Sequence, residues 1–112
     1  MKIYKDDNVF AKILRNEIPC KKVYEDDLVL CFHDINPEAK IHLLIIPKIK
    51  CVDFSDFISC ATPLQVSLFF TTIKKIAEDI LNLKESGYKL KTNNGKNAGQ
   101  EVFHFHVHLT SN

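Results

Sequence analysis

Short runs of apolar residues, many of them β-branched or aromatic, recur along the chain and end at turn-forming residues. These runs predict strands at residues 22–25, 28–33, 42–47 and 88–92. The run at 28–33 is strongly apolar, and we expect its Cys31 to serve as a small core hydrophobe. Residues 48–60 keep no clear period, and we expect them to be irregular or partly helical.

Two helices are predicted from capping residues and from wider apolar spacing. The first runs from the capping candidates Asp6 and Asp7 to about Arg15. The second begins at Thr62, because Thr-Pro-Leu-Gln supplies a cap, a proline at the first helical position and a glutamine at the third. It continues to about Leu83. The expected apolar stripes are Val9, Phe10, Ile13 and Leu14 in the first helix, and Leu64, Leu68, Ile73, Ile76, Ile80 and Leu83 in the second.

A last strand is predicted where apolar residues alternate with histidine, in EVFHFHVHL at residues 101–109. Neighbouring side chains of a strand point to opposite faces, so the three histidines would share one face. A helix would scatter them around its circumference. We expect the imidazoles of His104, His106 and His108 to face water or a cleft. The opposite face, which packs on a core, would carry Phe103, Phe105, Val107 and Leu109.

The predicted order of elements is one helix, three strands, one helix and two strands. Short loops favour antiparallel neighbours among the first three strands, and the last two can form a wide hairpin. We therefore predict an α+β fold in a single domain, 1–112, with an antiparallel sheet of about five strands. One long and one short helix would lie on one face of the sheet, and Phe103, Phe105 and Val107 would pack against the long helix.

The composition of the chain bears on which partners it binds and on the cellular compartment in which it works. The formal net charge of +1 gives no sign of a nucleic-acid or membrane partner. No apolar run reaches the roughly 20 residues of a membrane span, and no signal peptide is visible. We therefore expect a soluble cytoplasmic protein. With no secretion signal, we expect the four cysteines to be reduced thiols, and the lack of a Cys-x-x-Cys pair gives little support to a cysteine-based zinc site.

Three interpretations of the histidine row compete. Structural accident is one, although exposed strand faces usually carry Thr, Lys, Glu or Ser. A metal site is the second, because neutral histidine is the commonest metal ligand. The three alternating positions span about 13 Å at about 3.3 Å per residue, and one zinc ion at ~2.1 Å from each nitrogen hardly reaches all three. A two-histidine site completed by His42 remains open. We expect no cofactor to be required, with zinc as the runner-up chemistry.

Catalysis at a phosphoryl or acyl group is the third interpretation. An imidazole can attack phosphorus directly while neighbouring imidazoles orient it, bind phosphate oxygens or pass a proton. The loop before the strand supports this chemistry, because Gly95 and Gly99 let backbone amides approach an anion. Asn93 and Gln100 add amide side chains beside them.

These residues also carry a family resemblance. GQEVFHFHVHL resembles the signature of the histidine triad (HIT) superfamily, His-x-His-x-His followed by two apolar positions. The similarity extends over VFAKILRNEIP, VYEDDLVLCFHDINPEAKIHLLIIPK and GYKLKTNNGKNAGQEVFHFHVHL, and it points to the Hint-like branch of purine nucleotide-binding phosphoramidate hydrolases. It implies a homodimer with one continuous sheet and two purine-nucleotide sites.

The resemblance implies an enzyme that hydrolyses the P–N bond of purine nucleoside 5′-phosphoramidates, such as adenosine 5′-phosphoramidate, through a nucleotidyl-histidine intermediate. It assigns the nucleophile to His106, a contact with the α-phosphate to His108 and a supporting role to His104. His42 matches a fourth histidine that lies beside the triad in the family.

A nucleotide pocket is implied by the same resemblance. Asp34 matches the ribose ligand, and a carboxylate that accepts from two sugar hydroxyls suits that role. Glu101 departs from the family, where a serine often assists the leaving amine; a carboxylate there would repel a phosphate or pair with a protonated amine. Lys50 replaces a histidine often found after Pro-Lys, which weakens a zinc role in that region. The base-pocket wall is matched by Phe10, Ile13, Ile18, Phe32, Ile35 and Leu44, and the phosphate-binding segment by Asn93, Gly99, Gln100 and Val102.

Two alternatives to the phosphoramidate hydrolase stay open. One is a dinucleoside polyphosphate hydrolase of a neighbouring HIT branch. The other is a binding module that holds a purine nucleotide with negligible turnover. A covalent nucleotide on the protein would separate an enzyme from such a module.

Overall fold

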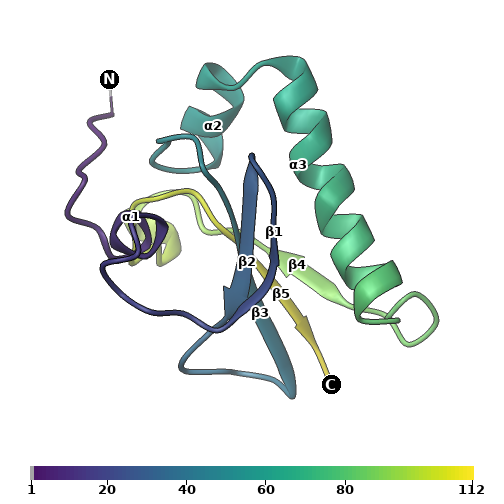
Figure 1. The fold of residues 1–112 in the computed structure, drawn as a ribbon. Helices are drawn as coiled ribbons and strands as arrows, with labels where there is room; N and C mark the ends of the chain where they lie inside the picture. The colour runs from purple at the N-terminus through teal and green to yellow at the C-terminus, as the bar shows by residue number, and fades with distance from the viewer. Residues whose placement is uncertain (1) are drawn as a thin grey trace.

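A five-stranded antiparallel sheet forms the centre of the computed structural model, which describes residues 2–112 (Figure 1). The order of its strands is β1-β2-β3-β5-β4, so the last strand in sequence lies between β3 and β4. The hairpin predicted for the last two strands is therefore confirmed. The strands are β1 (Lys22–Glu25), β2 (Val29–His33), β3 (Ile41–Pro47), β4 (Lys89–Lys91) and β5 (Val107–Ser111).

Three α-helices accompany the sheet, and the predicted α+β class is confirmed. They are α1 (Val9–Leu14), α2 (Phe54–Cys60) and α3 (Pro63–Lys75), and α3 continues into the π-helical turn η1 (Ile76–Ile80). A short 3-10 turn, η2 (Lys96–Ala98), lies in the loop before β5. The sequence predicted one short helix, and α2 adds a second within residues 48–60, the stretch that we expected to be irregular or partly helical. The N-cap of α1 is Asn8, whose side chain accepts from the amide of Ala11 at 2.9 Å, and not Asp6 or Asp7 as expected.

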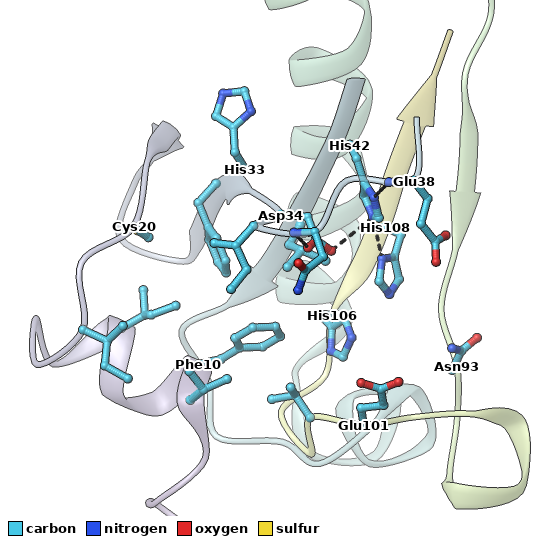
Figure 2. Close-up of a pocket in the computed structure, with 18 of the residues that line it drawn as sticks. Phe10, Cys20, His33, Asp34, Glu38, His42, Asn93, Glu101, His106 and His108 are labelled. Carbon is cyan, nitrogen blue, oxygen red and sulfur yellow. Dashed lines mark hydrogen bonds and ion pairs between the residues drawn. The ribbon is translucent and has the colours of Figure 1, made fainter. Parts of the chain in front are cut away.

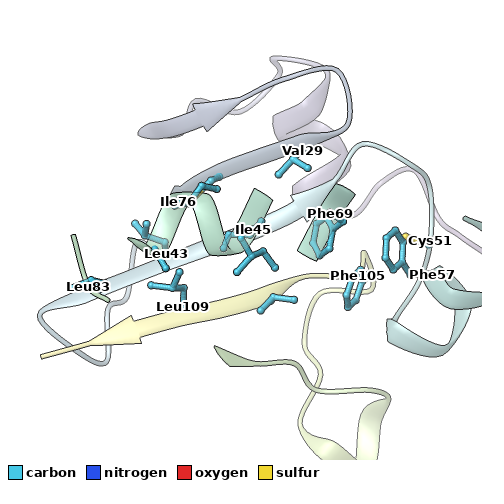
Figure 3. Close-up of a cluster of buried hydrophobic side chains, with 14 residues drawn as sticks. Val29, Leu43, Ile45, Cys51, Phe57, Phe69, Ile76, Leu83, Phe105 and Leu109 are labelled. Carbon is cyan, nitrogen blue, oxygen red and sulfur yellow. The ribbon is translucent and has the colours of Figure 1, made fainter. Parts of the chain in front are cut away.

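The sheet separates two apolar clusters. Successive residues of β2 point to opposite faces, so Val29 and Cys31 join one cluster while Leu30 and Phe32 join the other. The larger cluster lies under α2 and α3 (Figure 3). The smaller cluster lies under α1, so the helices cover both faces and the expectation of helices on one face is wrong. Cys31 is fully buried in the larger cluster, as predicted.

The long helix begins where the sequence predicted but buries a different stripe. The capping box is present: the amide of Gln65 donates to Thr62 Oγ1 at 3.1 Å, and the amide of Thr62 donates to Gln65 Oε1 at 2.9 Å. Phe69 faces the core because its ring packs against Phe57 and Phe105, at centroid distances of 5.1 and 5.4 Å. The buried residues of α3 and η1 are Phe69, Ile73, Ile76 and Ala77. The predicted stripe residues Leu64, Leu68 and Ile80 are exposed instead.

The histidine-rich segment is a strand only from Val107 onward; residues 101–106 lie outside the strand, with a bend at 102–104. The amide of Phe105 donates to the carbonyl of Cys51 at 2.8 Å, and the carbonyl of His106 accepts from Thr92 Oγ1 at 2.7 Å. These bonds hold the segment outside the regular ladder, so strict alternation fails there. Phe105, Val107 and Leu109 pack in the cluster under α3 as predicted, whereas Phe103 is 41% exposed.

No helix within residues 2–112 combines the length and the apolar character needed to cross a membrane.

Candidate active site

A cavity of about 540 Å³ opens beside α1, between the ends of β2 and β3 and the bent segment before β5 (Figure 2). It brings together fourteen of the sixteen residues that the sequence singled out. They are Phe10, Ile13, Ile18, Phe32, Asp34, Ile35, His42, Leu44, Asn93, Gly99, Glu101, Val102, His106 and His108. His104 and Gln100 are the two that do not line it.

Several lining residues were missed by the sequence analysis: Val9, Pro19, Cys20, His33, Asn36, Glu38 and Lys91. Some of them flank residues that were chosen, so proximity along the chain was an available signal. Lys91 carried no such signal, because it reaches the cavity through the pairing of β4 with β5.

His104 is fully buried and acts as a structural link. Its Nε2 lies 2.7 Å from the carbonyl oxygen of Pro47, which can only accept, so Nε2 carries the proton. The hydroxyl of Tyr4 then donates to His104 Nδ1 at 2.6 Å. Burial lowers the pKa of His104 to about 4, so this ring is neutral at pH 7. The prediction that all three imidazoles share an open face is therefore wrong for His104.

His106 is held with one nitrogen protonated and the other free. Its Nδ1 lies 2.7 Å from the carbonyl oxygen of His104, so Nδ1 donates and Nε2 keeps its lone pair. The ring stands edge-on to Phe10 with centroids 4.9 Å apart. Burial lowers the pKa of His106, and the bond to the His104 carbonyl and the charge of Asp34 offset this only in part. A neutral imidazole with an available Nε2 is the form that acts as a nucleophile.

His42 and His108 form a directed pair. The amide of Glu38 donates to His42 Nδ1 at 3.0 Å, so the proton of a neutral His42 sits on Nε2. That nitrogen lies 2.9 Å from His108 Nδ1, which accepts and leaves the His108 proton on Nε2. Burial is the main cause that lowers the pKa of His108, to about 4, and the positive charges of neighbouring basic side chains lower it further. These side chains are His106, His42 and Lys91. His108 therefore offers the cavity a neutral N–H donor beside His106, with their ring centroids 5.1 Å apart.

A metal ion fits this arrangement poorly. Atoms of Asp34, His42 and His108 lie within 4.8 Å of one another, which makes them one group of metal-ligand type within residues 2–112. A metal bound at His42 Nε2 would require a proton on Nδ1, because ligating histidines donate their other N–H. That position already faces the donating amide of Glu38. The zinc site that the sequence left open as runner-up therefore lacks the tautomer it needs.

The side of the cavity next to α1 is apolar. Phe10 and Phe32 pack edge to face with centroids 5.5 Å apart, and Ile13 and Leu44 are buried beside them. Ile35 also lines the cavity although it is 91% exposed, so it lies at the rim. Aromatic and aliphatic walls of this kind suit a flat, poorly hydrated ring.

The side chain of Gln100 holds the backbone of the loop before β5 in place. Gln100 Nε2 donates to the carbonyls of Val52 and Val102, at 2.8 and 3.0 Å, and its Oε1 accepts from the amide of Gly95 at 2.8 Å. Both Nε2 hydrogens and Oε1 are engaged by backbone groups, so Gln100 positions the loop. Gly99 has a φ of 90°, a left-handed conformation that glycine adopts without strain.

We expect the free energy of unfolding to fall as the pH is lowered from neutral toward 4. Histidines in the unfolded chain take up protons near pH 6.5, whereas His104 and His108 resist until about 4. Between these values the unfolded state binds more protons, so acidification favours unfolding. For the fully buried His104 the loss is on the order of 3 kcal/mol.

Urea unfolding at about pH 7 and about pH 4.5 measures this loss. His104→Gln should show a smaller difference between the two pH values than the wild type. His33→Gln, which replaces a histidine whose ring is exposed, is the control and should keep the wild-type difference. Equal differences in the wild type and His104→Gln would contradict the assignment.

Comparisons with known proteins agree with this geometry. The HIT domain family model matches residues 15–112. A HIT-like protein of Helicobacter pylori (strain ATCC 700392 / 26695) is 48% identical over 104 residues, which cover 93% of this chain and 95% of the relative. The purine nucleoside phosphoramidase of Escherichia coli (strain K12) is 42% identical over 104 residues, covering 93% of this chain and 86% of that protein.

Solved structures give the same result. A HIT-like protein superposes with a TM-score of 0.84 at 48% identity, covering 94% of this chain and 98% of the other. A HIT family hydrolase from Clostridium thermocellum superposes with a TM-score of 0.82 at 38% identity, covering 96% and 92%. The fold, the histidine segment and both kinds of similarity agree, and the chain belongs to the HIT family.

Proposed function

We propose that this protein is a hydrolase that cleaves the P–N bond of purine nucleoside 5′-phosphoramidates through a nucleotidyl-histidine intermediate. The observation that carries the proposal is the state of His106, whose Nδ1 donates to a carbonyl while its unprotonated Nε2 is left for the cavity. The name of the Escherichia coli relative, a purine nucleoside phosphoramidase 42% identical to this chain, supports the substrate class.

In the first step, His106 Nε2 attacks the phosphorus and forms a P–N bond to the imidazole. The bond from phosphorus to the leaving nitrogen breaks, and its electron pair stays on that nitrogen, which takes up a proton from solvent water and departs as an amine. His108, with its N–H on Nε2, donates a hydrogen bond to the phosphoryl oxygens as charge builds on them. The carbonyl of His104 stabilises the positive charge that develops on the His106 ring.

In the second step, water attacks the phosphorus of the nucleotidyl-histidine. The bond to His106 Nε2 breaks, its electron pair returns to the imidazole, and the nucleoside monophosphate leaves. The net reaction adds one water, with its hydroxyl on phosphorus and its hydrogen on the amine. The neutral imidazole that the folded environment favours is thereby restored.

The nucleoside would lie against the apolar side of the cavity. The rings of Phe10 and Phe32 take the base, and Asp34 at the end of β2 takes the ribose. Asp34 Oδ1 already accepts from the amide of Asn36 at 2.8 Å, which fixes the carboxylate in place. Its Oδ2, 3.3 Å from His42 Nε2, keeps further acceptor capacity for sugar hydroxyls.

Replacement of His106 by alanine should abolish turnover, with a loss of about a thousandfold or more, because the attacking nitrogen is gone. The measurement is hydrolysis of adenosine 5′-phosphoramidate, together with mass spectrometry after quenching in alkaline denaturant, since a histidine–phosphorus bond is labile in acid. The wild type should carry one nucleotide covalently and His106→Ala none.

His106→Gly supplies the matched control, because the smaller residue leaves room for free imidazole. Added imidazole should restore turnover to His106→Gly through a soluble imidazole nucleotide. Undiminished turnover by His106→Ala would show that another group attacks phosphorus. Nucleotide binding by the wild type without any turnover or adduct would favour the binding module.

Activity should fall on the acid side as His106 gains a proton, at a pH below the ordinary histidine value because its pKa is lowered. The charge of Asp34 raises this pKa, so Asp34→Asn should move the acid limb of kcat/KM to lower pH. Asp34→Glu keeps the charge and should leave the limb near its wild-type position. A shift of the Asp34→Asn limb to higher pH would contradict the electrostatic assignment.

A homodimer is proposed as the working assembly. Leu64 and Leu68 on α3 are 67% and 47% exposed, and Leu90 is exposed on β4 at one edge of the sheet. Exposed apolar side chains and an open strand edge are typical of surfaces that pair with another copy. Leu68→Asp should lower the mass found by light scattering to that of a monomer. Ile58→Asp, at a similarly exposed position on α2, should leave the mass unchanged, and a dimeric Leu68→Asp would reject this interface.

A further inference from the structure

A second cavity of about 440 Å³ adjoins the nucleotide cavity. Glu38, His42, Lys91 and His108 line both, so the two spaces meet at the pair of His42 and His108. The other residues of the second cavity are Ala39, Ser86, Gly87, Tyr88, Lys89, Thr110, Ser111 and Asn112. Its walls are mostly polar, whereas the nucleoside side of the first cavity is apolar.

His106 lies between the apolar wall of the first cavity and the polar second cavity. A substrate phosphorus at His106 would therefore have a different environment on each side. On one side its ring contacts Phe10, at a centroid distance of 4.9 Å, and beyond Phe10 lies the apolar wall. On the other side its ring neighbours His108 at 5.1 Å, and His108 borders the second cavity. Figure 2 shows Phe10 and His108 on different sides of His106. A nucleoside in the apolar part would therefore leave the polar side for the remaining substituent on phosphorus.

Lys91 gives this side its charge. Lys91 lies directly opposite His108 in the ladder of β4 and β5, and paired residues share a face of the sheet. Its ammonium is 3.9 Å from a carboxylate oxygen of Glu38, whose side chain is 72% exposed. An exposed pair at that separation binds weakly, so the ammonium is available to another anion. Lys89, two residues earlier on the same strand, lines the second cavity as well.

We infer that the second cavity receives the leaving group, and that Lys91 makes the enzyme favour leaving groups that carry an anionic substituent. The inference rests on the proposed function and adds a substrate class to it. The shared chemistry is a carboxylate or phosphate close to the scissile bond. An acidic amine, such as an amino acid, supplies the first, and the phosphate chain of a dinucleoside polyphosphate supplies the second.

Matched substrates test the charge preference. Adenosine 5′-phosphoramidates of β-alanine and of β-alaninamide have leaving groups of similar size, and only the first is anionic. The wild type should show a kcat/KM about fivefold higher for the β-alanine compound at low ionic strength, because Lys91 is half-exposed and partly screened. This ratio should shrink as salt is added.

Variants assign the preference to Lys91. Lys91→Gln should bring the ratio close to one, and Lys91→Glu should invert it. Lys84→Gln removes one positive charge at an exposed position outside both cavities, and should keep the wild-type ratio. Diadenosine triphosphate distinguishes the two anion sources: turnover faster than that of the β-alanine compound, and equally dependent on Lys91, identifies a phosphate chain.

Failure of the inference and failure of the proposed function give different results. Hydrolysis of both phosphoramidates at equal rates, or a ratio that survives in Lys91→Gln, overturns the role of Lys91 while the hydrolase stands. If the wild type hydrolyses none of the compounds, calorimetric binding of the same pair decides. Tighter binding of the β-alanine compound that is lost in Lys91→Gln supports the subsite without turnover, and equal binding overturns it.

Discussion

The hydrogen bond from His106 Nδ1 to the carbonyl of His104 is the interaction on which the candidate site depends. A carbonyl can only accept, so this contact fixes the proton on one nitrogen and leaves the other unprotonated. His104 is in turn held by Tyr4 and by the carbonyl of Pro47. The first histidine of the triad therefore works through its backbone and its buried ring, while the second presents its free nitrogen to the cavity.

Hydrogen bonds also fix the tautomers of the other two histidines of the site, His42 and His108. The amide of Glu38 sets the tautomer of His42, and His42 sets that of His108. Both chains of contacts start at backbone groups, whose donor and acceptor roles do not change with pH. The same direction of hydrogen bonding that leaves an N–H of His108 for the cavity opposes a metal ion at His42. Burial lowers the pKa values of all three triad histidines, so the site is poised as neutral imidazole.

The sheet places an apolar wall on one side of the histidines of the site and a charged lysine on the other side. β2 and β3 are apolar on both faces because α1 covers one side and α2 with α3 covers the other. The α1 side supplies an apolar wall through Phe10 and Phe32, and the pairing of β4 with β5 brings Lys91 beside His108. The cavity therefore has an apolar wall on the Phe10 side of His106 and the ammonium group of Lys91 on the His108 side.

The sequence by itself determined the α+β class, the positions of the first four strands, the capping box at Thr62 and fourteen of the residues that line the cavity. Local patterns and a family signature carry that information directly along the chain. Tertiary structure decided which apolar residues of α3 are buried, because the packing of Phe69 on Phe57 and Phe105 selects one side of a helix that is apolar on two. It also turned His104 inward, since the bonds of residues 105 and 106 to Cys51 and Thr92 break the strand alternation. Those partners, like Lys91 beside His108, are distant in sequence or set by strand pairing, so no local pattern of residues could reveal them.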